Sequence, residues 1–598
     1  TGSTAEIELY FDRITVQDDG WVDGRLCVVD TDGTGDYLSL NAAEADNFGA
    51  TSADLVANDE WVECDCQCTS GSADTERLTI DGFTVDQTHN IKIWCDPASG
   101  YRHNGVFSTS AYRIDHQYSY CITNHDADTF DGLQLYLHAN GTAGALIHEH
   151  EASLAELWVS NCIFRVDDLG VTSIAFRRRD SSCIAYVWNC ISYDADYGFI
   201  SQNGNSFFYN CTAVDCTTGF NVDNNTTVVK NCVPYNCTTE YGGSGTYSGD
   251  STNNAYTSTD PGSNGLDISG YTAADLFRDY ANDNFRFAEN SPLIDAGADL
   301  SSDADLSFSA DIRGALRHTG LWDIGAFEYP IQVTVVVDTD GTGDYASLSA
   351  AVTGEARDLI TPNEQLVIDC QCTSGSADST PATIDGFTTD PDCFVKAWCD
   401  PASGFRHNGI WNDTAYRLVY GDRHSSTLQF ISDYIAAEGL QIANNDTLGD
   451  SGIRGVIVDS TGCSVRECII RRINFTDHGE ALVFTAIPTG GSVYIWNNLI
   501  YDFDYGVYSE NNYSGVVHSG AIYSNTVFAV GQGFRLRYGT GNAENLSIIN
   551  NIAQSGVGFF GDNLGITATN ISEDATSPDG ASFQNITLTF ENAANGNY

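Results

Sequence analysis

The chain repeats one short motif four times in its middle, as VSNCIF (159–164), VWNCIS (187–192), FYNCTA (208–213) and VKNCVP (229–234). Each motif is a β-prone stretch with alternating apolar residues, and its asparagine recurs after 28, 21 and 21 residues. Short strands at this spacing, with polar turns and no helical period, predict the coils of a parallel β-solenoid. One such coil cannot bury its own apolar face, so stacked coils must share one core.

The motif asparagines are expected at one position in successive coils, with their side chains pointing inward and their amides hydrogen-bonded along the solenoid axis. A fifth comes from YIWNNLIYDFDYGVYS (494–509), which matches YVWNCISYDADYGFIS (186–201) almost residue for residue. The predicted ladder comprises Asn161, Asn189, Asn210, Asn231 and Asn497. The cysteine after each of the first four is expected to form an interior stack. The total of 19 cysteines is odd, which leaves at least one thiol unpaired and the disulfide pattern open.

The two halves of the chain repeat each other beyond this motif. DTDGTGDY occurs at 30–37 and 338–345, TIDGF at 79–83 and 383–387, and WCDPASG at 94–100 and 398–404. We therefore predict an all-β chain of two tandem β-solenoid modules, at 27–330 and 331–598. Residues 1–26 are interpreted as an N-terminal strand or attachment segment.

Each module opens with a strand, the DGTGDY motif and a short Ala-rich stretch, LSLNAAEA or ASLSAAVT. This opening resembles that of pectin-lyase-like right-handed parallel β-helices, in which a short helix caps the first coil and shields its open edge. The TIDGF, RHNG and AYR motifs look like tandem β-helix modules of tailed-virus particles and of secreted bacterial or archaeal surface proteins. The resemblance implies two right-handed parallel β-helices, each opened by a capping helix. It implies no single activity, because this scaffold hosts lyases, hydrolases, adhesins and virion fibres alike.

Module one ends in a segment that module two does not repeat. SPLIDAG (291–297), DIRG (311–314) and DIGAFEY (323–329) resemble the closing segment of large secreted β-helix repeat proteins. The final ANGNY of module two lines up with ANDNF (281–285), so residues 286–330 have no counterpart there. Because an open solenoid end exposes unpaired strand edges, we expect the parent protein to continue with a segment of this kind.

Acidic residues dominate the charge, with 81 Asp and Glu against 26 Lys and Arg and a net charge of −55. Such a field repels nucleic acid and anionic membranes, so neither is expected as a partner. It also keeps a protein hydrated where salt screens self-repulsion, which favours a saline habitat. The alternative is that the acids only fill the solvated face of a long fold. No apolar run approaches the roughly 20 residues of a membrane span, and membrane insertion is not expected.

Known catalytic sets of pectate lyases, polygalacturonases and pectin methylesterases are not found in the sequence. The best carboxylate candidates are Asp194 and Asp196 in YDADYG, with Asp502 and Asp504 in YDFDYG. Residues at i and i+2 of an extended stretch share a face, so each pair could serve acid/base hydrolysis or hold a cation. The alternative is a polar turn in which Asp bonds its own backbone and Gly supplies the positive φ.

The DTDGTGD motif resembles a calcium loop, because its oxygen-bearing side chains alternate and its glycines permit tight wrapping. The calcium candidates are Asp30, Asp32, Asp36, Asp338, Asp340 and Asp344. The motif lacks the distal bidentate acid of the longer calcium-loop pattern, and a simple turn before the capping helix is the alternative. No other cofactor is expected.

Two functions from different classes fit these observations. The first is a non-catalytic surface component, either a virion fibre, spike or decoration protein or a cell-surface adhesin. Its partners would be surface glycans, gripped by the many aromatic residues, or other particle or cell-surface proteins, and homo-oligomers are conceivable. The second is a polysaccharide depolymerase, a lyase or glycoside hydrolase, that acts in a β-helix groove. Duplication of whole modules favours the first, with an extracellular or virion-surface location.

Overall fold

The computed structural model of this protein describes residues 23–117, 120–126, 129–138, 144–149, 156–167, 172–179, 181, 183–421, 426–446, 453–474, 479–484, 491–511, 519–528, 531–538, 545–561, 567–579, 582 and 584–586. The chain divides into two compact units, Thr1–Tyr329 and Pro330–Tyr598, called unit 1 and unit 2. The strand that opens unit 1 begins at Asp23, inside the segment predicted to precede the first module. Residues 1–22 lie outside the described residues.

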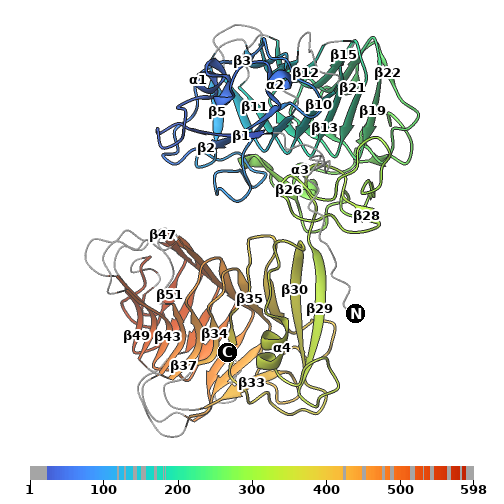
Figure 1. Ribbon diagram of the computed structural model, residues 1–598. Helices are drawn as coiled ribbons and strands as arrows, with labels where there is room; N and C mark the ends of the chain where they lie inside the picture. Colours follow the sequence, from blue (N-terminus) through green and yellow to red (C-terminus); the bar gives the residue numbers. More distant parts are fainter. Residues whose placement is uncertain are drawn as a thin grey trace, which may run out of the picture. The chain divides into compact units, whose positions relative to one another are not determined.

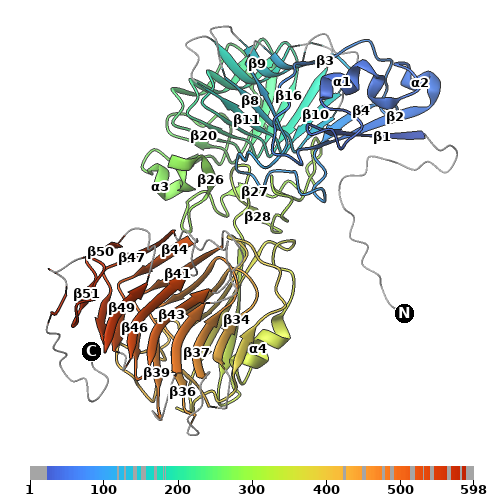
Figure 2. The same ribbon diagram turned by 90° about the vertical axis from the view of Figure 1, so that its left-hand side faces the viewer.

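Unit 1 is a β-helix whose coils contribute strands to three parallel sheets (Figures 1 and 2). Within a coil the chain runs from the first sheet to the second and then to the third, as in β10, β11 and β12. Parallel strands joined by such crossovers connect right-handedly, and the predicted right-handed parallel β-helix is confirmed. The first sheet contains, in spatial order, β1 (Asp23–Asp30), β2 (Glu60–Gln67), β4 (Ile91–Trp94), β7 (Thr129–Asp131), β10 (Glu156–Ser160), β13 (Ile184–Trp188), β16 (Ser206–Tyr209), β19 (Thr226–Lys230) and β22 (Thr246–Tyr247).

The other two sheets of unit 1 are shorter and complete the coils. The second sheet contains β5 (Arg113–His116), β8 (Gln134–Leu137), β11 (Ile163–Val166), β14 (Ile191–Tyr193), β17 (Thr212–Val214) and β20 (Val233–Tyr235). The third sheet contains β3 (Leu78–Ile80), β6 (Tyr120–Asn124), β9 (Gly144–Glu149), β12 (Ser173–Arg178), β15 (Tyr197–Gln202), β18 (Thr218–Asp223) and β21 (Thr239–Gly242).

Unit 2 repeats the three-sheet architecture. Its first sheet contains β29 (Ile331–Asp338), β30 (Glu364–Gln371), β32 (Val395–Trp398), β35 (Ile435–Glu438), β38 (Cys463–Arg466), β41 (Ser492–Trp496), β44 (Ser519–Tyr523), β47 (Asn545–Ile549) and β50 (Thr567–Ala568). Its second sheet contains β33 (Arg417–Tyr420), β36 (Gln441–Asn444), β39 (Ile469–Arg472), β42 (Leu499–Tyr501), β45 (Thr526–Phe528), β48 (Ile552–Gln554) and β51 (Ile571–Ser572). Its third sheet contains β31 (Ala382–Ile384), β34 (Ser426–Phe430), β37 (Ile453–Val458), β40 (Gly479–Phe484), β43 (Tyr505–Asn511), β46 (Gln532–Tyr538) and β49 (Val557–Gly561).

The core of each unit is a column of side chains stacked from coil to coil. In unit 1 the strand register aligns Val159, Val187, Phe208 and Val229, all of which are fully buried. Successive side chains of a strand point to opposite faces, so the apolar alternation read from the sequence places one row inside the helix and one outside. The hydrophobic motif therefore becomes a continuous core.

A short helix caps the first coil of each unit, as the resemblance implied: α1 (Leu40–Ala45) in unit 1 and α4 (Leu348–Glu355) in unit 2. The helix α1 is anchored by Asp74, whose carboxylate accepts hydrogen bonds from the N–H of Leu40 (2.8 Å) and from the hydroxyl of Tyr112 (3.0 Å). Burial raises the pKa of Asp74 above its ordinary value. The remaining helices are η1 (Asn47–Gly49), α2 (Leu55–Asn58), α3 (Ala273–Leu276) and η2 (Tyr280–Asn282).

The motif asparagines of unit 1 lie at the corner between the first and second sheets. All four have φ between 49° and 54°, a left-handed conformation that asparagine tolerates better than most residues. The buried side chains of Asn189, Asn210 and Asn231 turn towards residues 296–328 rather than into the core, whereas that of Asn161 donates to the carboxylate of Asp131 (2.6 Å). The side-chain N–H of Asn210, for example, donates to the carbonyls of Asp323 (3.0 Å) and Gly325 (2.9 Å). The cysteine after each asparagine takes the inward position, and all four cysteines are buried.

The predicted inward ladder is therefore wrong for these four residues, although two amide bonds of 3.1 Å join Asn189 to Asn161 and Asn231 to Asn210. It is also wrong for Asn497, which takes the left-handed corner position (φ 55°) and is exposed. A continuous inward ladder does exist in unit 2, one residue later in the motif. It comprises Asn498, Asn525, Asn551 and Asn570, in which each Nδ2 lies 3.0 Å from the next Oδ1.

A closing segment, residues 273–329, covers the corner of unit 1 and the outer faces of the two sheets beside it. It contains two short antiparallel strand pairs, β25–β26 and β27–β28, in place of further coils, and its apolar residues pack on the second sheet. Its strands, with the two that precede it, are β23 (Ala255–Tyr256), β24 (Leu266–Asp267), β25 (Phe277–Asp279), β26 (Asn284–Phe287), β27 (Gly297–Ala298) and β28 (Leu321–Trp322).

Candidate functional site

The carboxylate candidates Asp194 and Asp502 lie directly after β14 and β42, in the left-handed conformation (φ 61° and 63°). Because their backbone is not extended, the predicted pairing of Asp194 with Asp196 on one face is wrong. The carboxylate of Asp196 instead accepts hydrogen bonds from the N–H of Ser173 (2.8 Å) and the hydroxyl of Thr217 (3.3 Å).

Asp504 belongs to the same turn in unit 2, where its carbonyl accepts hydrogen bonds from the N–H groups of Gly531 (3.1 Å) and Gln532 (2.7 Å). The aspartates, not the following glycines, supply the positive φ of both turns. Gly198 is required for another reason, since a Cβ there would lie 2.6 Å from the carbonyl oxygen of Gly219 in the next coil. These bonds of Asp196 and Asp504 thus go to neighbouring coils, and the alternative turn in which Asp bonds its own backbone and Gly supplies the positive φ is not the arrangement seen.

Asp194 lies beside an arginine that is surrounded by aromatic rings. Arg165 of β11 is aligned with Tyr136 of β8 and with Tyr193 of β14. Its guanidinium carbon lies 5.1 Å and 5.7 Å from the ring centres of these tyrosines, and 5.4 Å from that of Phe107. These distances are in the range of cation–π attraction, which holds the guanidinium in place at the surface of the second sheet.

Unit 2 builds the same cluster. Arg471 of β39 is aligned with Tyr501 of β42, and its guanidinium carbon lies 5.8 Å from the ring centre of Tyr501 and 4.6 Å from that of Trp411. Trp411 follows RHNG in the loop as Phe107 does in unit 1. Asp502 follows Tyr501 as Asp194 follows Tyr193. Both units therefore combine one arginine, a loop aromatic residue, a tyrosine of the next coil and one aspartate, and these groups are called the arginine clusters.

The aspartates of both clusters resist ionisation. Burial is the largest cause that raises the pKa of Asp194 to about 6, and the charges of Asp215 and Asp283 add to it, while Arg165 acts in the opposite direction. Burial also raises the pKa of Asp502, again opposed by the neighbouring arginine. A carboxyl group with a pKa near neutrality can donate or accept a hydrogen bond to a ligand.

Unit 1 places further carboxylates near Asp194, those of Asp215 and Asp283. Asp215 follows β17 one coil beyond Asp194 in register. Its carboxylate accepts hydrogen bonds from the hydroxyl of Tyr280 (2.5 Å) and the side-chain N–H of Asn236 (2.5 Å). The aligned position in unit 2 is Ala529, which lies outside the described residues. The paired acids that glycoside hydrolysis needs are therefore not a shared feature of the two clusters.

Stacked aromatic rings line the outer face of the first sheet in both units. In unit 1, Tyr186 stacks on Trp158 and on Phe207, with ring centres 4.2 Å and 5.0 Å apart. In unit 2, Trp496 and Tyr523 stack at 5.5 Å with nearly parallel planes. These rings are half-buried, and in unit 1 they pack against apolar residues of the closing segment.

The calcium candidates use their oxygens in hydrogen bonds to their own turns and to neighbouring ones. Asp30 is buried and accepts hydrogen bonds from the hydroxyls of Thr34 (2.9 Å) and Thr69 (2.5 Å). Although burial opposes it, these bonds lower the pKa of Asp30 below its ordinary value. Asp32 accepts a bond from the N–H of Thr34 (3.0 Å). The other candidates accept similar bonds from backbone N–H groups or hydroxyls: Asp36, Asp338, Asp340 and Asp344. Nowhere in the described part of the chain do three or more His, Cys, Asp or Glu side chains form a group that could hold a metal ion.

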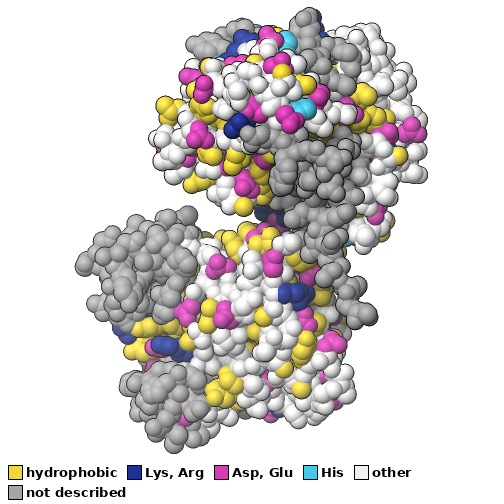
Figure 3. Space-filling view, in the orientation of Figure 1, with side chains coloured by type: hydrophobic (Ala, Val, Ile, Leu, Met, Phe, Trp, Pro, Cys, Tyr) yellow, Lys and Arg dark blue, Asp and Glu magenta, His cyan; other side chains and the backbone are white. Residues whose placement is uncertain are grey.

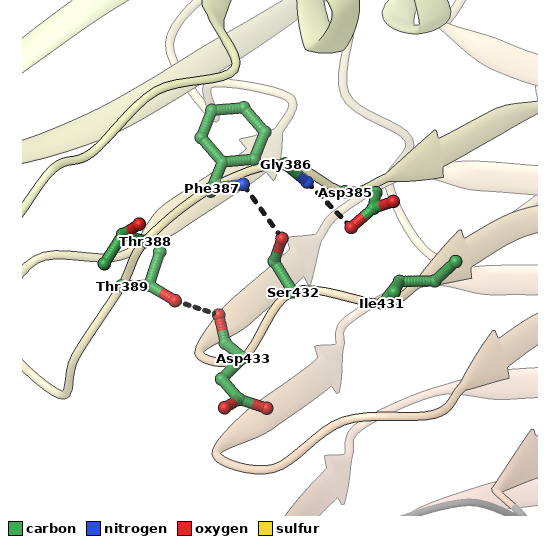
Figure 4. Close-up of a pocket in the computed structure, with 8 residues that line it drawn as sticks. All are labelled: Asp385, Gly386, Phe387, Thr388, Thr389, Ile431, Ser432 and Asp433. Carbon is green, nitrogen blue, oxygen red and sulfur yellow. Dashed lines mark hydrogen bonds between the residues drawn. The ribbon is translucent and has the colours of Figure 1, made fainter.

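A shallow polar depression in unit 2 follows β31 and is lined by Asp385–Thr389 and Ile431–Asp433 (Figure 4). In it the N–H of Phe387 donates to the hydroxyl of Ser432 (3.0 Å), and the Thr389 hydroxyl donates to the Asp433 carbonyl (2.7 Å). In unit 1 the N–H of Phe83 likewise donates to Asp126 (2.8 Å). These bonds fix the turn after TIDGF, so the depression is part of the coil design.

Acidic side chains are spread over the visible face of both units and do not gather in one patch (Figure 3). Within the described residues, no helix is long and apolar enough to span a membrane.

No protein-family model and no curated protein matches the chain. Among solved structures, it is similar to a pectin methylesterase from carrot at 12% identity, with a TM-score of 0.26, over 44% of this chain and 89% of that one. It is also similar to a pectin methylesterase from Aspergillus niger at 10% identity, with a TM-score of 0.25, over 45% of this chain and 94% of that one. These likenesses concern the fold and carry no argument about activity.

The sequence pointed to Asp194 and Asp502 but missed the arginines and aromatic residues around them. A signal was present: NCIFR (161–165) and ECIIR (467–471) place an arginine at the same position of one coil in each module. Only an alignment of single coils, rather than of whole modules, would have shown it.

Proposed function

We propose that this protein is a non-catalytic component of a cell or virion surface that binds glycans through its two arginine clusters. The observation that supports this proposal is the repetition of arginine, two aromatic residues and one aspartate in both units. A duplicated binding site gains avidity when both copies engage one ligand. A duplicated hydrolytic site would need a second available carboxylate in each copy.

The chemistry of each cluster suits a sugar. The half-buried loop residues Phe107 and Trp411 offer an apolar face to a pyranose ring, although Tyr193 and Tyr501 are each only 2% exposed. The guanidinium and the carboxyl group donate and accept hydrogen bonds with hydroxyls. The net charge of −55 opposes the approach of polyanions, so neutral glycans are the expected class. An extracellular or virion-surface location belongs to this proposal, because such glycans are met there.

A polysaccharide depolymerase is the second candidate, and one observation in unit 1 favours it. Asp194 has a pKa of about 6, suited to a general acid, and Asp215 and Asp283 lie close enough to raise it. Asp215 is already hydrogen-bonded to Tyr280 and Asn236, which makes it a weak base or nucleophile. We therefore rank cleavage behind binding.

Calorimetric titration of the purified chain with a panel of neutral and acidic polysaccharides tests the proposal. Arg165→Gln and Arg471→Gln should each disable one site, remove the avidity and weaken binding about tenfold, and the double variant should lose the remaining binding. Arg454→Gln is the matched control, because Arg454 is a part-exposed arginine that pairs with Glu480 outside both clusters. Release of reducing ends or unsaturated sugars that is lost in Asp194→Asn would establish the depolymerase instead, and absence of binding to every glycan would reject both.

A further inference from the structure

The corner of unit 1 binds a polypeptide segment through its motif asparagines. Asn231 makes two hydrogen bonds of 2.8 Å with the backbone of Ala298, one to its N–H and one to its carbonyl. Asn210 donates to the carbonyls of Asp323 and Gly325. These four bonds involve main-chain groups of the closing segment, and a side chain adds one more, because Arg317 donates to the Oδ1 of Asn189 (2.9 Å). The corner therefore recognises mainly an extended backbone.

An apolar row beside the corner completes this docking surface. Ile191, Thr212 and Val233 are aligned on the outer face of the second sheet, and each is at most 2% exposed. The hydroxyl of Thr212 accepts a hydrogen bond from the N–H of Ala326 (3.1 Å). At Gly325, with φ 121°, a Cβ would lie 3.1 Å from that hydroxyl oxygen, so the segment needs glycine where it approaches most closely.

Unit 2 carries the same surface without its cover among the described residues. The aligned row on its second sheet is Leu499, Thr526 and Ile552, all of which are half-buried. The corner residues before them are Asn497, Ser524 and Asn550, which have φ between 55° and 57°. Asn497 and Asn550 are exposed, where their counterparts in unit 1 are buried. These six residues are called the open band.

We propose that the open band binds a polypeptide segment with the chemistry of residues 296–328. Such a segment is extended, has glycine at the points of closest approach and places small apolar residues over the apolar row. Three features of the band fit this occupant. Its corner offers amide and hydroxyl groups for main-chain bonds, Thr526 is in the place of Thr212, and Leu499 and Ile552 continue the apolar row. Within this chain, residues 296–328 already occupy unit 1.

The test is a fusion in which residues 286–329 follow Tyr598 directly, since ANGNY aligns with ANDNF and the fusion reproduces the spacing of unit 1. Amide hydrogen exchange of residues 497–499, 524–526 and 550–552 should slow about tenfold relative to the parent chain. The same protection, at lower occupancy, should appear when a synthetic peptide of residues 286–329 is added in excess to the parent chain. Linking the segment covalently to the chain removes most of the entropic cost of association, so the fusion is the more sensitive of the two experiments.

Two variants of the fusion decide the result. Leu499→Asp should remove the protection, because it places a charge in the apolar row. Ile431→Asp is the matched control, because Ile431 is 44% exposed and lies outside the band, and protection should remain. The proposal is overturned if neither arm shows protection, or if protection survives Leu499→Asp. It is overturned in favour of a second copy if the parent chain alone forms dimers that Leu499→Asp dissociates.

Discussion

The two units place the same aromatic side chains beside the same corner, yet they surround them differently. Tyr209 of unit 1 is fully buried, and its hydroxyl donates to Asp303 of the closing segment (3.2 Å). Its counterpart in unit 2, Tyr523, is half-buried and stacks on Trp496. The repeated motif therefore determines where a side chain lies on the coil, while a segment distant in sequence determines whether solvent reaches it.

The interior of the corner differs in a complementary way. Unit 1 places cysteines inward and satisfies its corner asparagines through the closing segment. Unit 2 places asparagines inward, where they bond to one another and to main-chain carbonyls, as Asn525 does with Ile495 (2.9 Å). Buried amides must be hydrogen-bonded in either arrangement. Each unit thus satisfies the hydrogen bonds of one row of asparagines, which lies outside the coils in unit 1 and inside them in unit 2.

The largest expected effect comes from removing a buried ring of the closing segment. Phe327 is 2% exposed, and its ring lies 6.3 Å from that of Phe287. Phe327→Ala should lower the free energy of unfolding of unit 1 by about 3–5 kcal/mol, because truncation leaves a cavity against the coil. Unit 2 should be unaffected. Urea denaturation followed by hydrogen exchange resolves the two units.

The control for this variant is Leu321→Ala in the same segment, because Leu321 is 57% exposed and its truncation should change stability by no more than about 0.5 kcal/mol. Equal destabilisation of both units by Phe327→Ala would break the comparison, since it would mean that the closing segment does not belong to unit 1 alone.

The inward ladder of unit 2 gives the next effect. The Oδ1 of Asn525 accepts hydrogen bonds from the N–H and the Nδ2 of Asn498, and its own Nδ2 donates to Asn551. Asn525→Ala leaves several buried groups without partners and should cost about 2–3 kcal/mol. Cys211→Ala, at the aligned position of unit 1, should cost about 1 kcal/mol, because a buried thiol contributes mainly packing. Urea denaturation of both variants checks the difference, and equal costs would show that the ladder adds nothing beyond packing.

The sequence predicted the coils because strand spacing, apolar alternation and the capping motif are local signals, and each acts within one turn of the solenoid. It could not predict which way the corner asparagines turn. Asn189 and Asn497 occupy the same place in the repeat, but the closing segment covers Asn189 and not Asn497, and the contact of Asn189 with Ala310 joins residues more than a hundred positions apart. The prediction missed the inward ladder by one residue. The motif reads NC in unit 1 and NN in unit 2, and its first asparagine lies at the corner in both units. Only the second asparagine of NN faces the core.

The arginine clusters were missed for a related reason. Arg165, Phe107 and Tyr193 come from three different coils or loops, and only the strand register brings them together. Asp194 was found because its motif is duplicated, but its left-handed backbone was not evident from an alternating pattern. Short motifs therefore located one member of the site, and tertiary packing supplied the rest.

The smallest expected effect concerns the charge of Asp194. Its pKa in the folded chain is about 6, above the ordinary 3.8, so the folded state binds a proton more tightly than the unfolded state. The stability of unit 1 should then fall as the pH rises from about 4 to about 6, since the unfolded chain releases its proton first. Asp194→Asn removes this dependence and should stabilise unit 1 at pH 7 by less than about 1 kcal/mol. The residue is exposed and its carboxyl group is only partly desolvated, so water screens much of the interaction. At pH 4 the variant and the parent should differ little.

Asp196→Asn is the control, because the carboxylate of Asp196 makes structural hydrogen bonds with Ser173 and Thr217, and their loss should destabilise unit 1 at pH 7. Thermal denaturation at pH 4 and at pH 7 measures the stability of both variants. If Asp194→Asn stabilised unit 1 as much at pH 4 as at pH 7, the neighbours of the carboxyl group would not be what keeps it partly protonated.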